Sequence, residues 1–316
     1  MINGLDFRRL RRRKLALAAF ALSAPFLLPT VAPGAGSFVQ PAMAESAGKT
    51  DVSRVVSVGG AVTEIIYALG EEARLVGRDS TSTYPEAAKT LPDVGYMRQL
   101  APEGIIAVNP SAIVAVDGSG PPEALAVLKD ANIAFTSVPE TFDKAGIPAK
   151  IRTIGAFLGV EDKAEALAKT VEADLDAAVA ESAARPQAER KRVLFVLSTQ
   201  GGKIMASGTG TAANGIIELS GAVNAVGTFP GYKALTDEAI IEAKPDVVLM
   251  MDRGGEHSAK ADEIFALPAL SLTPAAKEKV LIRMDGLHLL GFGPRTASAV
   301  RELNAAIYGK KANASQ

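Results

Sequence analysis

The chain has 316 residues, a net charge of −1 and no cysteine, and 48% of its residues are hydrophobic. The lack of cysteine excludes disulfides, thiolate metal sites and a lipid anchor on an N-terminal cysteine. The near-neutral charge argues against a nucleic-acid partner, which requires clustered basic residues.

Residues 1–44 have the pattern of a cleaved export signal. Six basic residues precede the apolar run Leu15–Leu28, and Ala42-Met43-Ala44 matches the A-x-A cleavage pattern. The alternative, a membrane anchor, requires a longer uninterrupted run. Cleavage would remove 44 of the 316 residues, with six bases and one acid, and leave a soluble periplasmic product with net charge −6. The sequence leaves open whether the Sec or the twin-arginine route exports it.

Strand and helix patterns alternate from residue 54 onward. β-branched runs bounded by breakers fit buried parallel strands, and their alternation with helices predicts an α/β lobe over residues 45–140. The expected strands are Arg54–Val58, Leu75–Gly77, Ala112–Val116 and Ala134–Val138, with helices at Ala61–Leu69 and Pro121–Ala131.

Residues 141–189 have a different character and predict a helical spine. Asp162–Ala184 is rich in Ala and Glu and contains no breaker, which indicates one long helix. Lys191–Leu197 restarts the strand pattern and opens a second α/β lobe over residues 190–316. The expected fold is α/β, with two similar lobes, each holding a short and mainly parallel sheet, joined by the long helix.

An internal repeat supports the two lobes. Leu100–Gly120 aligns without a gap with Leu235–Gly255, and each copy reads as a short helix, a proline break and an apolar strand. The repeat places Glu103 of the first copy opposite Glu238 of the second. The spacing between the two copies is too long for a solenoid repeat, and a single repetition at this spacing instead indicates two related lobes.

The loops at the strand ends should carry function, and they contain no enzyme motif. No Gly-x-Ser-x-Gly elbow occurs, and the two histidines, His257 and His288, lie in separate loops without metal-site spacing. Ser207 and Gly208 open a turn before a helix, which fits either an anion site or an ordinary helix cap. Tyr96 is two residues from Arg98, and a nearby cation favours the phenolate that would bind ferric iron.

The chain resembles periplasmic haem-binding proteins of bacterial ABC-type haem importers over nearly its whole mature length. The residues that carry the resemblance are Arg54–Gly60 (RVVSVGG), Thr63-Glu64-Ile65, Ser82–Pro85 (STYP), Val94–Gly104 (VGYMRQLAPEG), Gly231–Leu235 (GYKAL) and Met284–Arg295 (MDGLHLLGFGPR). STYP is shared with cobalamin and siderophore binders, so Tyr84 marks only the broader class. The VGYMRQL piece is more specific to haem binders.

The resemblance implies a non-enzymatic carrier of class III periplasmic-binding-protein architecture that binds ferric haem b between its lobes. It implies Tyr96 as the axial iron ligand, Arg98 as its hydrogen-bonding partner and Arg253 near the propionates. Tyr232, Ser207 and Gly208 are further expected ligand contacts. Some relatives have a histidine in a Leu-Ser-His-Gly-Gly loop and hold a second haem. Here the loop reads LSTQGG, so we expect one haem, with His257 or His288 as an open choice for a sixth ligand.

The same resemblance implies docking to an ABC permease dimer through Glu103 and Glu238, one in each lobe. The alternative is that each Glu only stabilises the first turn of its helix. We expect a monomer that works alongside an outer-membrane haem receptor system. The alternatives are a ferric-siderophore or cobalamin binder of the same architecture and, from another class, a secreted enzyme.

Overall fold

The computed structural model describes residues 50–252 and 260–309. The expected signal peptide therefore lies outside the described residues. Within the described part, no helix is both long enough and apolar enough to span a membrane.

The first sheet has four parallel strands in the order β2-β1-β3-β4. The strands are β1 (Val55–Val58), β2 (Leu75–Arg78), β3 (Ala112–Val116) and β4 (Ala134–Val138). Both central strands, β1 and β3, are buried at every position, as expected of a parallel sheet covered on both faces. The four strands predicted from the sequence are confirmed to within one residue at each end.

Helices cover both faces of this sheet. They are α1 (Gly60–Ala68), α2 (Pro102–Ile106) and α3 (Pro122–Asp130), with the short 3-10 helices η1 (Glu72–Arg74) and η2 (Glu86–Thr90). Successive residues of a strand point to opposite faces. Accordingly, Val114 packs in one hydrophobic cluster with α1, and Ile113 packs in another with α2 and α3. We call this sheet and its helices the N-terminal lobe.

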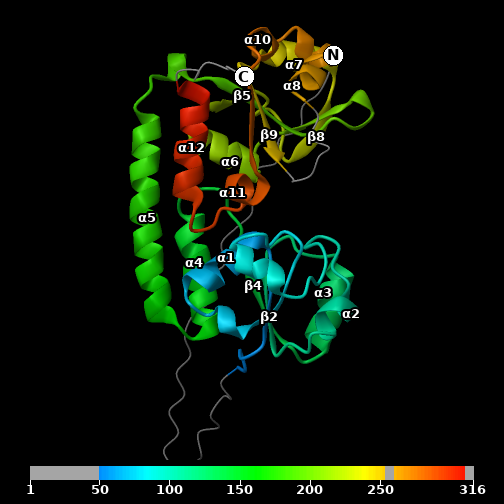
Figure 1. Ribbon diagram of the computed structural model, residues 1–316, viewed down its shortest axis with the longest axis vertical. Coiled ribbons are helices and arrows are strands. Elements are labelled where there is room, and N and C mark those ends of the chain that lie inside the picture. Colours follow the sequence, from blue (N-terminus) through cyan, green and yellow to red (C-terminus); the bar gives the residue numbers. More distant parts are fainter. Residues whose placement is uncertain (1–49, 253–259, 310–316) are drawn as a thin grey trace, which may run out of the picture. The chain divides into compact units, whose positions relative to one another are not determined.

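Two helices follow the first sheet and lie against each other (Figure 1). They are α4 (Gly146–Leu158) and α5 (Glu161–Ala183), and α5 confirms the long unbroken helix predicted from the sequence. Their contact is close because a Cβ on Gly155 would lie 2.1 Å from Cβ of Ala164. Only glycine fits at this position. Along its length, α5 buries a row of mostly small side chains and also packs against α12.

The second sheet is mixed, with the order β10-β9-β5-β6-β8 and β7 paired to β5. Its strands are β5 (Arg192–Ser198), β6 (Ile204–Ser207), β7 (Val223–Asn224), β8 (Tyr232–Leu235), β9 (Val247–Asp252) and β10 (Leu281–Asp285). The pairs among β5, β7, β9 and β10 are parallel, whereas β6 is antiparallel to both β5 and β8. The expected mainly parallel sheet thus carries an antiparallel extension.

We call the second sheet and the helices around it the C-terminal lobe. They are α6 (Ala212–Leu219), α7 (Asp237–Ala243), α8 (Ala261–Phe265), α9 (Pro268–Ser271), α10 (Pro274–Lys277), α11 (Gly286–Leu290) and α12 (Thr296–Tyr308), with the 3-10 helices η3 (Gln187–Glu189) and η4 (Gln200–Gly202). The α/β fold class predicted from the sequence is confirmed. The repeat is also visible, since each copy forms a short helix followed by a strand, α2 and β3 in one and α7 and β9 in the other.

Candidate functional site

The loop after β2 is held by a buried network around Asp79. Asp79 is fully buried, and its Oδ1 accepts hydrogen bonds from the Gly59 amide at 2.9 Å and from Ser82 Oγ at 2.6 Å. Ser82 continues the network to the hydroxyl of Thr63 in α1, 2.6 Å away. Because each hydroxyl is engaged, the loop has a fixed course, and it presents Tyr84 with 43% of its surface exposed.

Tyr96 stands in a second loop that is anchored on both sides. The Ser80 amide donates to the Gly95 carbonyl at 2.9 Å, and the Gly120 amide donates to the Met97 carbonyl, also at 2.9 Å. Gly95 has a φ of 101°, a conformation that favours glycine. Tyr96 remains 40% exposed between these anchors. The loop is therefore fixed while its phenol is accessible to a ligand.

Tyr232 faces this loop from the other lobe. Its phenol hydrogen-bonds with Ser207 and Thr211, and it lies within electrostatic range of Arg98 and Tyr96. Burial raises the pKa of Tyr232, and the charge of Arg98 opposes that rise more weakly. A phenol ordinarily ionises near pH 10, so Tyr232 is neutral at neutral pH and can donate a hydrogen bond. We use the name Tyr96 cluster for five residues, Tyr96, Arg98, Ser207, Thr211 and Tyr232.

The turn between β6 and α6 contains Ser207 and Gly208, for which the sequence allowed either an anion site or a helix cap. The amides of Gly208 and Thr209 donate to backbone carbonyls within the protein, and Thr211 Oγ1 accepts from the Asn214 amide at 3.0 Å as the cap of α6. A Cβ on Gly208 would lie 1.9 Å from the Phe229 carbonyl, so the turn requires glycine. These contacts favour the helix cap over the anion site.

A buried ion pair lies beside the Tyr96 cluster. Lys150 of α4 has a fully buried side chain, and its Nζ lies 2.5 Å from Glu140 Oε1 and 3.2 Å from the Phe292 carbonyl. Glu140 follows β4, keeps 18% of its side chain exposed and is within electrostatic range of Arg98 and Asp117. Burial raises the pKa of Glu140, and Lys150 acts against that rise.

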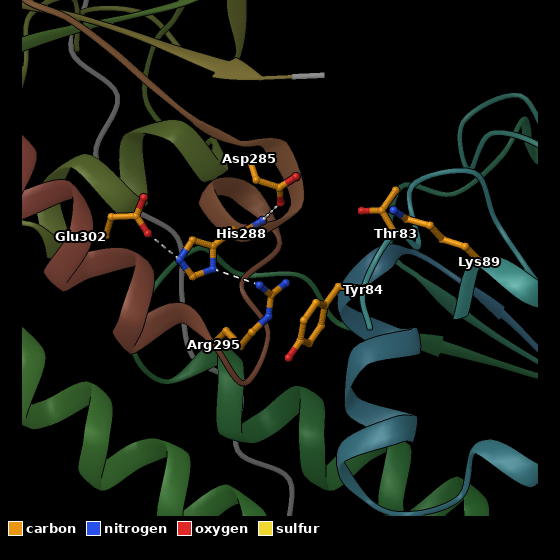
Figure 2. Close-up of a pocket in the computed structure, with 7 residues that line it drawn as sticks. All are labelled: Thr83, Tyr84, Lys89, Asp285, His288, Arg295 and Glu302. Atoms are coloured by element: carbon orange, nitrogen blue, oxygen red, sulfur yellow. Dashed lines mark hydrogen bonds and ion pairs between the residues drawn. The ribbon is translucent and has the colours of Figure 1, made fainter. Parts of the chain in front are cut away.

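A cavity of about 340 Å³ lies between the two lobes (Figure 2). It is lined by Thr83, Tyr84 and Lys89 from the N-terminal lobe and by Asp285, His288, Arg295 and Glu302 from the C-terminal lobe. The guanidinium of Arg295 stacks on the ring of Tyr84 at 3.6 Å. The same guanidinium pairs with the buried Glu64 of α1, with Nη2 3.0 Å from Oε2. Charged side chains therefore connect the lobes along this cavity.

Both ring nitrogens of His288 are occupied. Nδ1 lies 3.3 Å from Arg295 Nη1, and Nε2 lies 3.2 Å from Glu302 Oε2 (Figure 2). The arginine can only donate, so Nδ1 accepts, and Nε2 carries the hydrogen that Glu302 accepts. A histidine engaged at both nitrogens has no free lone pair for iron, which argues against His288 as a sixth ligand.

The structure gathers most, but not all, of the predicted site residues. Tyr96, Arg98, Tyr232 and Ser207 come together with Gly208 adjacent to them, while Tyr84 lines the cavity with Arg295. Two predicted residues, Arg253 and His257, lie outside the described residues. The sequence reading gave no role to Arg295, Glu64, Glu140 or Lys150. Arg295 and Glu64 belonged to motifs already noted, but nothing in either motif indicated that they pair.

Neither a metal centre nor a cluster of metal-ligand type is found in the described parts of the chain. There, no three histidine, aspartate or glutamate side chains are close enough together to hold an ion.

Glu103 and Glu238 are both exposed, in the first turns of α2 and α7. Thr236 caps α7 by accepting from the Ala239 amide at 3.2 Å, whereas no side chain caps α2. Hydrogen bonds from its own backbone amide and from Thr236 lower the pKa of Glu238.

Comparison with known proteins gives a consistent result. The family model described as periplasmic binding protein matches residues 55–286. The solved periplasmic heme-binding protein BhuT in complex with two hemes is 40% identical, with a TM-score of 0.76, over 80% of this chain and 97% of that chain. Periplasmic heme-binding protein RhuT from Roseiflexus sp. RS-1 is 36% identical, with a TM-score of 0.77, over 82% and 98% of the two chains. The ABC transporter substrate-binding lipoprotein YvrC of Bacillus subtilis (strain 168) is 29% identical over 82% of this chain and 81% of its own.

Proposed function

Because the chain belongs to the periplasmic binding protein family, we propose that it is the substrate-binding protein of an ABC importer and that its cargo is haem. The observation that carries this proposal is the Tyr96 cluster. An exposed phenol on an anchored loop has a cation two residues away and faces hydrogen-bonding side chains of the other lobe. The similar solved structures named above are heme-binding proteins, which agrees with this reading.

In this proposal Tyr96 binds ferric haem b as its axial ligand. A phenolate is an anionic oxygen ligand suited to ferric iron, and tyrosine is a known haem ligand. Arg98 stabilises the phenolate by its charge. Tyr232 stays protonated and offers its hydroxyl group on the opposite side, and the buried hydroxyl of Ser207 supports it from behind the site surface. Arg253, Tyr84 and Gly208 stay proposed ligand contacts, and one haem binds per chain.

The export route and partners form part of the same proposal. The chain carries a cleaved signal over residues 1–44 and works in the periplasm as a monomer. Its lobes, residues 45–140 and 190–316, are joined by the spine 141–189 and deliver haem to a permease dimer. Glu103 and Glu238, one on each lobe, contact arginines of that permease, because opposite charges at two separate points set both orientation and association rate. An outer-membrane receptor system supplies the haem.

The test is an absorption spectrum of the haem-loaded protein, compared with Tyr96→Phe. The wild type should show the charge-transfer band of a ferric phenolate, and Tyr96→Phe should lack it. Tyr67→Phe, in α1 and away from the cluster, is the matched control and should keep the band. Equal spectra for wild type and Tyr96→Phe would assign the ligand to another residue. If no haem is taken up, the cargo is a cobalamin or a ferric siderophore instead.

A further inference from the structure

Lys150 is a positively charged residue in the interior of the protein. Its side chain is 0% exposed, although lysine is almost never fully buried unless it is paired. Burial of an ammonium strongly destabilises the folded state unless a partner and further hydrogen bonds compensate. The Glu140 carboxylate and the Phe292 carbonyl provide that compensation, at 2.5 Å and 3.2 Å from Nζ. The proposed carrier function described above uses neither charge.

The ammonium is fixed from the inside. Phe292, whose carbonyl it contacts, lies between α11 and α12 in the C-terminal lobe and is itself buried. The Phe292 ring packs edge-on against Phe142, with 5.3 Å between ring centroids. Because Lys150 is surrounded by packed groups from both lobes, it holds the Glu140 carboxylate at one place.

Glu140 lies two residues after β4, at the edge of the sheet to which the Tyr96 loop is attached. Its side chain is partly exposed and lies within electrostatic range of Arg98 and of Asp117, the residue that follows β3. Asp117 accepts a hydrogen bond from Ser137 of β4, which keeps it at the same edge of the sheet. The Tyr96 loop is tied to this edge through the Gly120 amide and the Met97 carbonyl. Two carboxylates thus stand where β3 and β4 end, beside the proposed ligand.

We propose that Glu140 determines ligand specificity: its carboxylate, held by Lys150, excludes ligand carboxylates from the β3–β4 end of the site. The inference rests on the proposed function, since it concerns the same site. A ferric porphyrin with its carboxylates on one side can turn them away from Glu140. A porphyrin with carboxylates around its whole ring cannot, and always places one near Glu140 and Asp117.

The physical basis is like-charge repulsion at short range. At the effective dielectric of a protein surface, the repulsion between two like unit charges about 8 Å apart weakens binding by roughly tenfold or more. Lys150, 2.5 Å from Glu140 Oε1, offsets much of this repulsion but not all of it, because the two charges do not coincide. In the proposed site the charge of Arg98 is directed to the Tyr96 phenolate.

The experiment compares two ferric porphyrins, haem b with two propionates and coproporphyrin III with one on each of its four pyrrole rings. Dissociation constants for both are measured by absorbance titration at low and at high salt. The variants are Glu140→Gln and Asp117→Asn, with Glu123→Gln, an exposed residue of α3, as the matched control. Wild type should prefer haem, and Glu140→Gln should narrow that preference roughly tenfold by binding coproporphyrin more tightly. Glu123→Gln should behave as wild type.

Glu140→Gln leaves Lys150 without its counter-charge, so Glu140→Gln/Lys150→Met and Asp117→Asn provide folded alternatives. The double variant should show a smaller gain for coproporphyrin than Glu140→Gln, because it also removes the positive charge of Lys150, and Asp117→Asn should likewise show a smaller gain. The inference would be overturned if the ratio of the coproporphyrin and haem dissociation constants were the same in wild type and in all of these variants. It would also be overturned if that ratio fell only because haem bound more weakly. If wild type binds neither porphyrin, the proposed function fails and this inference falls with it. If wild type binds haem and its preference is insensitive to Glu140, only the inference fails.

Discussion

Arg295, at the start of α12, reaches to Glu64 in the second turn of α1 and holds it by two bonds. Its Nη2 lies 3.0 Å from Glu64 Oε2, and its backbone amide donates to Oε1 at 3.2 Å. The two residues are 231 positions apart in the chain. Glu64 is buried, so this pair is a buried link between the lobes rather than a surface contact.

Removing one partner of this link should destabilise the protein. Arg295→Met should lower the free energy of unfolding by about 3 kcal/mol, because it leaves the buried Glu64 carboxylate without its partner. Glu64→Gln should lower it less, because Arg295 keeps 28% of its side chain exposed. Urea unfolding followed by circular dichroism gives the measurement. The double variant should lose less than the sum of the two, since both single changes break the same pair.

The matched control is the exposed pair of Lys89 and Glu86, 2.7 Å apart. Lys89→Met should change the unfolding free energy by less than about 1 kcal/mol. Additive losses at Glu64 and Arg295 would show that the two side chains act independently.

The turn at Gly208 should not tolerate a side chain. Gly208→Ala places a methyl group against the Phe229 carbonyl, and backbone atoms cannot move aside as a side-chain tip can. We expect a loss of about 2 kcal/mol or more in unfolding free energy, together with weaker haem binding, because Ser207 and Tyr232 flank this turn. Gly104→Ala is the control. Its nearest neighbour would be 3.5 Å away, which is ordinary contact, and it should be close to neutral. Equal stability of the two variants would contradict the argument.

The ionisation of Glu71 should make the stability of the protein depend on pH. Lys163 of α5 donates to Glu71 at 2.6 Å, and this hydrogen bond is the main reason that the pKa of Glu71 is lowered. A lowered carboxyl pKa contributes stability that is present above the unfolded value of about 4.3 and is lost as pH falls through the folded value. Glu71→Gln should therefore be less stable than wild type at pH 7, and the difference should shrink between about pH 5 and pH 3.

Unfolding curves collected across that pH range provide the measurement. Lys163→Met should reproduce part of the effect, since it removes the main cause of the shift. Glu72→Gln, the exposed neighbour, is the control and should follow wild type at each pH. A difference that grows toward acid would have the wrong sign and would exclude Glu71 as its source.

The two exposed glutamates should affect transport and leave ligand binding intact. Glu103→Arg and Glu238→Arg should each lower the stimulation of the partner permease's ATPase by the loaded protein, because each reverses a charge at the proposed contact. Haem affinity should stay unchanged in both. Glu242→Arg, exposed on the same helix as Glu238, is the control for a general change of charge. A loss caused equally by Glu242→Arg would remove the specific role of Glu238.

The sequence predicted the parallel core of the fold well, because its signals are local. Buried β-branched runs such as Ala112–Val116 have both a fitting composition and clear breakers at each end. The antiparallel extension of the second sheet was not predicted. β8 is largely exposed, so it has no buried apolar pattern. β6 is only four residues long, and α6 and β7 separate it from β8 in the chain, so the sequence gives no local signal that the two strands pair.

Of the site, the sequence indicated the residues on loops and missed the pairs that form over long distances. Tyr96 and Arg98 are two residues apart, so their association was already visible. Glu64 and Arg295, or Lys150 and the Phe292 carbonyl, meet only after the lobes have packed. A buried lysine inside an otherwise ordinary amphipathic helix gives no signal of its partner in the sequence.

The contact of Gly155 with Ala164 has an energetic consequence for ligand capture. No long side chain separates α4 from α5 at this point, so one helix cannot roll over the other without a clash of backbones. A binding protein whose halves are held this way spends little free energy on closing around its ligand. Its dissociation constant then reports the ligand contacts themselves, and a mutation at those contacts should act on affinity undiluted by a conformational equilibrium.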